Sequence, residues 1–115
     1  PGSIRNPVCV GKLSRRDPLA VAEFKFVRSL TDRPVKIALP GPYLLIRTMW
    51  GPKVSAKYYP KPTDMADDVV RILRDELIAL RDAGCEFVQF DEPVLTEVVH
   101  SGKAQEGESF SRTFM

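Results

Sequence analysis

The amino-acid sequence predicts an α/β fold in which parallel strands are joined by helices. Three short runs rich in β-branched or aromatic residues are predicted to be strands, at residues 8–13, 35–39 and 86–90. Two segments between them carry apolar residues three to four positions apart, which is typical of helices with one apolar face. The order strand, helix, strand, helix, strand predicts parallel strands with right-handed crossovers and helices packed on the sheet.

The first strand is predicted from a short apolar run. The helix after it is predicted from residues that are typical of helix starts and ends. Residues 8–13 are short and contain β-branched side chains. Asp17 can cap a helix, and Pro18 suits its first position because an N–H there has no helical partner. The helical spacing continues to Leu30, and Pro34 ends it because proline cannot continue the hydrogen-bond ladder.

The second strand, residues 35–39, is stopped by a proline–glycine–proline turn at residues 40–42. Two prolines around a glycine cannot extend a central strand, so the chain must leave the sheet there. Residues 43–62 then form a connection longer than most in compact domains. Such a connection is often functional, or it contains a short helix.

The second helix is the strongest predicted element. Thr63 can cap it, and Asp64 and its acidic neighbours place negative charge near the positive end of the helix dipole. Gly84 closes it as a left-handed C-cap before the strand 86–90. One face is traced by its apolar residues, Ala66, Val69, Val70, Leu73, Leu77 and Leu80.

Composition excludes several classes of protein. The 115 residues include 17 Lys or Arg and 15 Asp or Glu, and the formal net charge of +2 is too small to indicate binding to nucleic acid or to an anionic membrane. No apolar run approaches the ~20 residues of a transmembrane helix, and no basic and apolar leader is present. Cys9, Cys85 and one histidine cannot form a closed four-ligand zinc site from Cys and His.

Three strands would leave an unpaired edge on each side of the sheet. The chain is therefore expected to be a piece of a larger α/β fold. Its ends agree with this expectation, since it starts at Pro1 without a methionine and stops at Met115.

Functional groups of parallel α/β folds lie at the carboxyl ends of the strands. Asp91 ends the third predicted strand, and alternation places it on the same face as Gln89. It could therefore point into a site, where it would bind an ammonium group or a metal, or take a proton. Equally, it could cap a loop by accepting backbone N–H groups at the strand end.

Other candidates carry weaker signals. Glu97 lies beyond a proline and could be a solvated loop residue, and the lone His100 lies in a polar segment. Trp50, Tyr58 and Tyr59 could stack on a flat ligand or simply anchor the long connection. No phosphate-binding glycine motif and no nucleophile elbow is present.

Two motifs carry a resemblance to a known family. The first is Val35-Lys36-Ile37-Ala38-Leu39-Pro40-Gly41-Pro42, and the second is Ala83-Gly84-Cys85-Glu86-Phe87-Val88-Gln89-Phe90-Asp91-Glu92-Pro93-Val94-Leu95-Thr96-Glu97. Together, and in this order around an acidic-capped helix, they resemble the cobalamin-independent methionine synthase family. The resemblance covers residues 8–97. It is closer to the single-barrel members, which are similar to the C-terminal catalytic half of the long enzyme.

The resemblance implies a fold and a reaction. The fold is a partial (β/α)8 TIM barrel, with about three parallel strands and two long helices in residues 8–97 and a polar tail at 98–115. The reaction of the cytoplasmic parent enzyme is methyl transfer from 5-methyltetrahydrofolate, as its polyglutamate, to homocysteine, which makes methionine. A zinc ion in the parent binds the thiol and lowers its pKa, so that a thiolate is the nucleophile.

The resemblance also assigns roles to residues. Asp91 is implied to hold the amino group of the thiol amino acid, Glu97 matches an acidic position near the same site, and Trp50 is the nearest candidate for the aromatic that stacks on the folate. The family's zinc ligands, a His-x-Cys pair, a Glu and a further Cys, are expected beyond Met115. The chain itself is thus expected to hold no zinc and no catalytic residue, and to be inactive alone.

Two alternatives stay open. One is another zinc thiol alkyltransferase of the same superfamily, for example one acting on coenzyme M. The other is a non-catalytic α/β module that binds a partner or self-associates. As a fragment of a larger fold, the isolated chain is expected to self-associate through its open sheet edges if it folds.

Overall fold

The computed structural model describes residues 5–100, and the side chains up to residue 98. In chain order its elements are α1 (Val21–Leu30), β1 (Lys36–Pro40), α2 (Pro42–Met49), the 3-10 helix η1 (Ser55–Lys57), α3 (Pro62–Asp82), β2 (Phe87–Asp91) and α4 (Thr96–His100). The alternation of helices and strands confirms the predicted α/β class. No helix in this range is long and apolar enough to cross a membrane.

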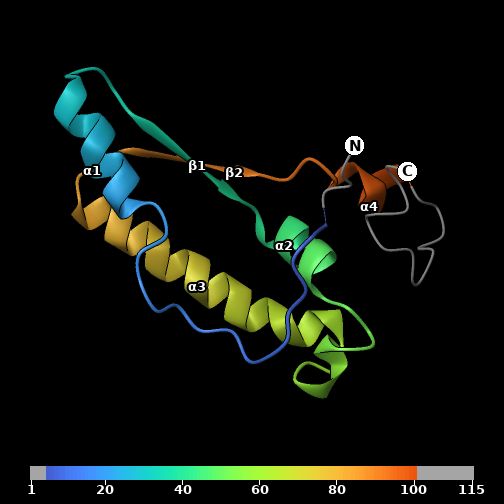
Figure 1. Ribbon diagram of the computed structural model, residues 1–115. Coiled ribbons are helices and arrows are strands. Elements are labelled where there is room, and N and C mark those ends of the chain that lie inside the picture. Colours follow the sequence, from blue (N-terminus) through green and yellow to red (C-terminus); the bar gives the residue numbers. More distant parts are fainter. Residues whose placement is uncertain (1–4, 101–115) are drawn as a thin grey trace.

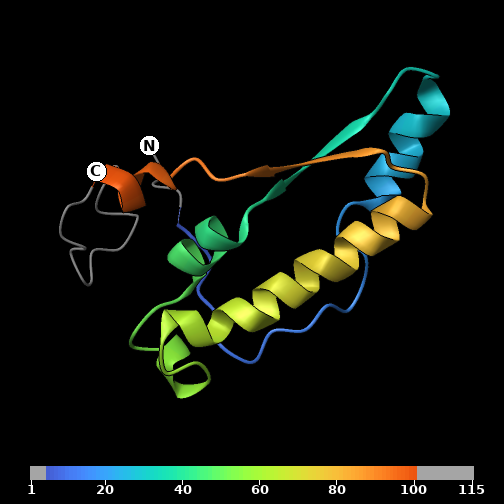
Figure 2. The same cartoon turned by 180° about the vertical axis from the view of Figure 1, so that it is seen from behind.

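The strands β1 and β2 are parallel neighbours, with Lys36 opposite Phe87 and Pro40 opposite Asp91. The connection between them contains α2, η1 and α3. Figure 1 shows α3 running alongside the strand pair, with α1 near one of its ends and α2 and η1 near the other; Figure 2 shows the same arrangement from behind. The parallel pair with its helical crossover is the repeating unit of an α/β barrel.

The prediction of a strand at residues 8–13 is wrong, so the described residues 5–100 contain two strands rather than about three. The amide of Cys9 donates to the carbonyl oxygen of Met49 (2.7 Å), and the amide of Leu13 donates to the Tyr59 hydroxyl (2.8 Å). The first acceptor belongs to the last residue of α2 and the second is a side chain, so neither bond is part of a strand ladder. The segment instead runs along α3 on the side away from the strands (Figures 1 and 2).

The core consists of two buried clusters spaced along α3. One cluster lies at its N-terminal half and contains Cys9, Tyr59, Met65, Val69 and Leu73. The other lies at its C-terminal end and contains Ala20, Phe24, Leu39, Leu80 and Cys85. The first cluster joins the N-terminal segment to the long connection, and the second joins α1 and β1 to α3.

Helix α1 begins at Val21 rather than near the predicted cap at Asp17. The carboxylate of Glu76, on α3, accepts hydrogen bonds from the amides of Leu19 and Ala20, both at 2.8 Å. A distant carboxylate therefore binds the amides of the two residues that precede α1, and the predicted local cap at Asp17 lies outside the helix.

Helix α3 begins one residue before Thr63, and Lys61 rather than Thr63 is its N-cap. Asp64 accepts a hydrogen bond from the Lys61 amide (2.9 Å). At the other end Gly84 has φ 96°, as predicted for a left-handed C-cap. The amides of Gly84 and Cys85 donate to the carbonyl oxygens of Arg81 and Leu80, which is the Schellman arrangement.

Candidate functional site

The carboxyl ends of the two strands lie side by side. Pro40 is opposite Asp91, and the amide of Gly41 donates to the carbonyl oxygen of Asp91 (2.8 Å). The chain then enters α2 after β1 and α4 after β2. Acidic and basic side chains from both connections therefore gather at this end of the sheet, where parallel α/β folds place their sites.

The two faces of the strand pair differ in chemistry. Ile37, Leu39 and Val88 pack in the cluster with α1 and α3. Alternation places Lys36, Gln89 and Asp91 on the opposite face, and all three are exposed. The Lys36 Nζ donates to the Gln89 Oε1 (2.7 Å), and the Gln89 Nε2 donates to the Asp91 Oδ1 (2.6 Å).

Glu92, which the sequence analysis did not single out, caps α2. Its Oε1 accepts a hydrogen bond from the Tyr43 amide (2.8 Å), and its Oε2 accepts one from the Leu44 amide (2.9 Å). A Cβ on Gly41 would overlap this side chain, so any larger residue there would have to displace the Glu92 carboxylate. The backbone-capping role considered for Asp91 therefore belongs to its neighbour. The sequence did contain a signal for this capping role. It was an acidic residue at the end of one strand, together with a glycine turn between the other strand and a helix.

Glu97, on α4, lies against α2. Its Oε2 accepts a hydrogen bond from the Tyr43 hydroxyl and forms an ion pair with the Arg47 Nε, both at 3.3 Å. Burial, and then the nearby Glu97 charge, raise the pKa of Tyr43 above its ordinary value. The Tyr43 hydroxyl is thus kept protonated as a donor to Glu97. The structure brings Glu97 to the strand end that also carries Asp91.

The aromatic residues of the long connection anchor it. The indole Nε1 of half-buried Trp50 donates to the carbonyl oxygen of Tyr59 (2.8 Å). Tyr59 is buried, and its hydroxyl donates to Asp68 Oδ2 (2.5 Å). Burial raises the pKa of Tyr59, and the Asp68 hydrogen bond adds to this effect. The anchoring role that the sequence left open is therefore the one observed for Tyr59.

The described residues do not form a site for the zinc ion that the sequence resemblance implied. Cys9 and Cys85 are free and belong to separate clusters. Their thiols donate to the carbonyl oxygens of Gly11 and Phe87 respectively. Across residues 5–100, no three His, Cys, Asp or Glu residues converge as metal donors.

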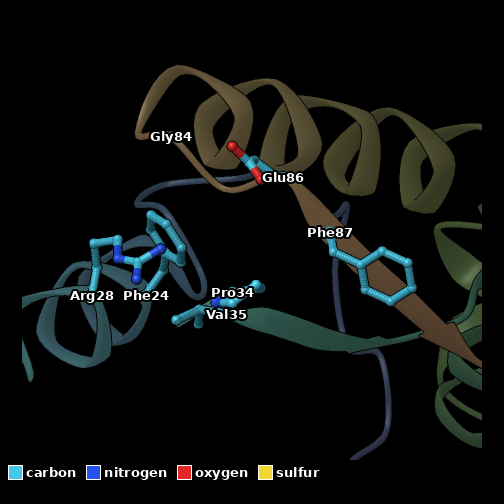
Figure 3. Close-up of a pocket in the computed structure, with 7 residues that line it drawn as sticks. All are labelled: Phe24, Arg28, Pro34, Val35, Gly84, Glu86 and Phe87. Carbon is cyan, nitrogen blue, oxygen red and sulfur yellow. The ribbon is translucent and has the colours of Figure 1, made fainter. Parts of the chain in front are cut away.

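A hollow of about 290 Å³ lies at the opposite end of the strands. Phe24 and Arg28 of α1 form one side, and Pro34 and Val35 lead into β1 (Figure 3). Phe87 lies at the start of β2, at the far end of that strand from Asp91. This hollow is therefore separate from the acidic strand ends.

Comparison with known proteins places this chain in a family. The model of the cobalamin-independent synthase catalytic domain matches residues 2–114. The chain belongs to this family. The resemblance seen in the two sequence motifs is confirmed, and the strand pair with its helices is part of the family's (β/α)8 barrel.

Three curated relatives of this family are each named 5-methyltetrahydropteroyltriglutamate–homocysteine methyltransferase. The protein of Thermosynechococcus vestitus is 37% identical over 94 residues, which cover 82% of this chain and 12% of the relative. Those of Mycobacterium leprae and Corynebacterium efficiens are each 34% identical, covering 91% and 90% of this chain. The chain spans 12–13% of the length of these relatives. No solved structure matches the chain at a significant level.

Proposed function

We propose that this chain is part of an enzyme that transfers the methyl group of 5-methyltetrahydropteroyltriglutamate to the sulfur of homocysteine. Family membership and the names of its relatives support this reaction class. We further propose that zinc, which would activate the thiol in the whole enzyme, is held by residues outside this chain, because the described donors do not fit it. We place this chemistry in the cytoplasm, in agreement with two unpaired cysteines.

The observation that carries the proposal is the exposed Asp91 carboxylate at the strand ends. Both oxygens of the neighbouring Glu92 accept backbone amides, so that residue is occupied with capping α2. Asp91 accepts one hydrogen bond through Oδ1, and its Oδ2 accepts none from the described residues. Asp91 is therefore the carboxylate suited to bind the ammonium group of homocysteine.

Glu97 and Trp50 complete the proposed substrate contacts. Glu97 is a second acidic group at the same strand end, oriented by Tyr43 and Arg47. The ring of Trp50 is oriented by its hydrogen bond to the Tyr59 carbonyl and is only half-buried. We propose that Trp50 offers its exposed part to the flat ring system of the methyl-folate.

The test is a steady-state assay of methionine formation by a protein of full family length that contains this chain. Asp91→Asn should raise the KM for homocysteine about tenfold or more, because a charged hydrogen bond to the ammonium group is lost. Asp75→Asn makes the same charge change on the exposed side of α3 and should leave the KM unchanged. We expect no turnover from the isolated 115-residue chain.

The possible outcomes are separable. Absence of methyl transfer by the long protein, with both substrates and zinc supplied, would refute the proposed reaction. Methyl transfer with the same KM for homocysteine in Asp91→Asn and Asp75→Asn would support the proposed reaction and show that Asp91 does not bind the substrate.

We also propose that the isolated chain self-associates. Each strand of the pair has an outer edge with no partner among the described residues. Phe87 and Phe90 point to opposite faces of β2, and both are exposed. Association of copies through these edges would pair backbone groups and cover apolar surface.

A further inference from the structure

A continuous chain of hydrogen bonds crosses the exposed face of the strand pair. It begins at Lys36, at the start of β1, passes through Gln89 in the middle of β2, and ends at Asp91. Gln89 lies opposite Ala38, so the Lys36 side chain reaches along the sheet to meet it. These are two side chain–side chain contacts in series, and the second reaches Asp91 at the carboxyl end of β2.

The chemistry of the three groups determines the direction of this chain. An ammonium group only donates, so it must face the Oε1 of Gln89. The Gln89 amide group then has its Nε2 directed away from Lys36, and an ionised carboxylate is an acceptor for it. Lys36 thus selects the orientation of Gln89 that donates to Asp91. With the amide reversed, Gln89 would present an oxygen to the carboxylate and repel it.

All three side chains are exposed, so solvent competes for these hydrogen bonds and the chain stabilises the fold little. It does hold one oxygen of Asp91 and thereby limits rotation of the carboxylate. The other oxygen accepts no hydrogen bond from the described residues, and the residue as a whole is exposed. Such preorganisation favours binding of a cation because less side-chain freedom is lost when it binds.

We propose that Lys36 and Gln89 are positioning residues that orient Asp91 for the ammonium group of the amino-acid substrate. The inference rests on the proposed function, since it takes Asp91 as the ammonium contact. Lys36 lies four residues before Pro40, about 13 Å along the strand, so it acts through Gln89 and not on the substrate.

The hydrogen-bond chain can be tested in the 115-residue protein by its side-chain amide resonances. The Gln89 signals, assigned by their loss in Gln89→Leu, should show one amide proton displaced downfield by its bond to Asp91. Lys36→Met and Asp91→Asn should both remove this displacement, whereas Asp75→Asn should leave it in place. Unchanged Gln89 signals in Lys36→Met and Asp91→Asn would overturn the hydrogen-bond chain.

The positioning role can be tested by methyl-transfer kinetics of the full-length family protein. Gln89→Leu and Lys36→Met should raise the KM for homocysteine several-fold to tenfold, with kcat changed less than twofold. Lys36→Arg keeps a cationic donor at this position, so its KM should stay close to that of the parent. In an Asp91→Asn background, Gln89→Leu should add no further effect, because the group it positions has changed.

These measurements separate the two proposals. An active enzyme with the parent KM in both Gln89→Leu and Lys36→Met would overturn the positioning role and leave the reaction intact. If the full-length protein transfers no methyl group but the displaced Gln89 resonance is present, the proposed reaction is refuted and the hydrogen-bond chain is supported.

Discussion

Individual polar side chains join elements of this small structure that are distant in the sequence. Glu76 is fully buried in the middle of α3, and Arg15 pairs with it at 3.0 Å. Burial by itself would raise the pKa of Glu76, but the amides of Leu19 and Ala20 and the Arg15 guanidinium outweigh it and lower the pKa. The ionised form is therefore favoured in the folded state.

Replacement of Glu76 by Gln should lower the free energy of unfolding by about 2 kcal/mol at neutral pH, because charged hydrogen bonds are lost around a buried group. The pKa of Glu76 is lower in the folded state than its ordinary value of 4.5. Its stabilisation is thus complete above about pH 4.5 and is lost as the pH falls through the folded-state value. Denaturant unfolding between pH 7 and pH 3 measures both effects.

The control for this experiment is Glu23→Gln, which changes an exposed acidic residue on α1. It should leave the unfolding free energy within a few tenths of a kcal/mol of the parent. The gap between the parent and Glu76→Gln should close in acid. A gap that stays constant from pH 7 to pH 3 would contradict the role given to the carboxylate charge.

At the scale of elements, carboxylates distant in sequence bind backbone amides just before α1 and in the first turn of α2. Glu76 receives the amides at the entrance of α1, and Glu92 receives those of α2. Only α3, among these three, is capped by a neighbour in sequence, through Asp64. Local patterns predicted the helices themselves, but they placed the start of α1 too early because Glu76, on another element, holds the residues that precede it.

Gly41→Ala tests the link between the β1 turn and the start of α2. A methyl group here would overlap Glu92 and push its carboxylate away from the amides of Tyr43 and Leu44. We expect a loss of roughly 1–3 kcal/mol in unfolding free energy. Hydrogen exchange of the Tyr43 and Leu44 amides should accelerate, while exchange in the middle of α3 should change only by the global loss of stability.

Gly11→Ala is the matched control, because nothing lies within 4 Å of a Cβ at that position. It should be close to neutral. If Gly41→Ala and Gly11→Ala unfold with the same free energy, the close approach of Glu92 does not constrain the turn.

At the scale of the whole molecule, helices within the described residues 5–100 cover one face of the strand pair and leave the other without a helix. Ile37, Leu39 and Val88 pack toward α1 and α3, whereas the opposite face is exposed. Phe87 is 59% exposed on that face, and Phe90 is 39% exposed on the other. A sheet with this much uncovered apolar surface and two open edges is expected to seek further partners.

Sedimentation velocity of the isolated chain should show a mean mass above 12.9 kDa that rises with protein concentration. The physical reason is pairing of the open strand edges between copies. A reducing agent is required throughout, because Cys9 and Cys85 are free and could form intermolecular disulfides. A single species of monomer mass from micromolar to hundreds of micromolar would contradict this prediction.

The sequence by itself determined the α/β class, both strands of the pair, the long helix and its left-handed end at Gly84, because these depend on local periodicity and on proline and glycine conformations. The two motifs at residues 35–42 and 83–97 determined the family. These features depend on residues that are close together in the chain, so they can be predicted without knowledge of the fold.

Only the tertiary structure decided which acidic residue does what. The sequence placed Asp91 and Glu92 side by side and offered a capping role to Asp91 alone. The register of β1 with β2 and the turn at Gly41 bring the α2 amides to Glu92, and the Lys36 and Gln89 side chains leave Asp91 facing solvent. The same holds for residues 8–13, where strand formation depends on a neighbour that local sequence cannot supply. Contacts between residues some fifty positions apart settle these assignments, and local patterns do not contain them.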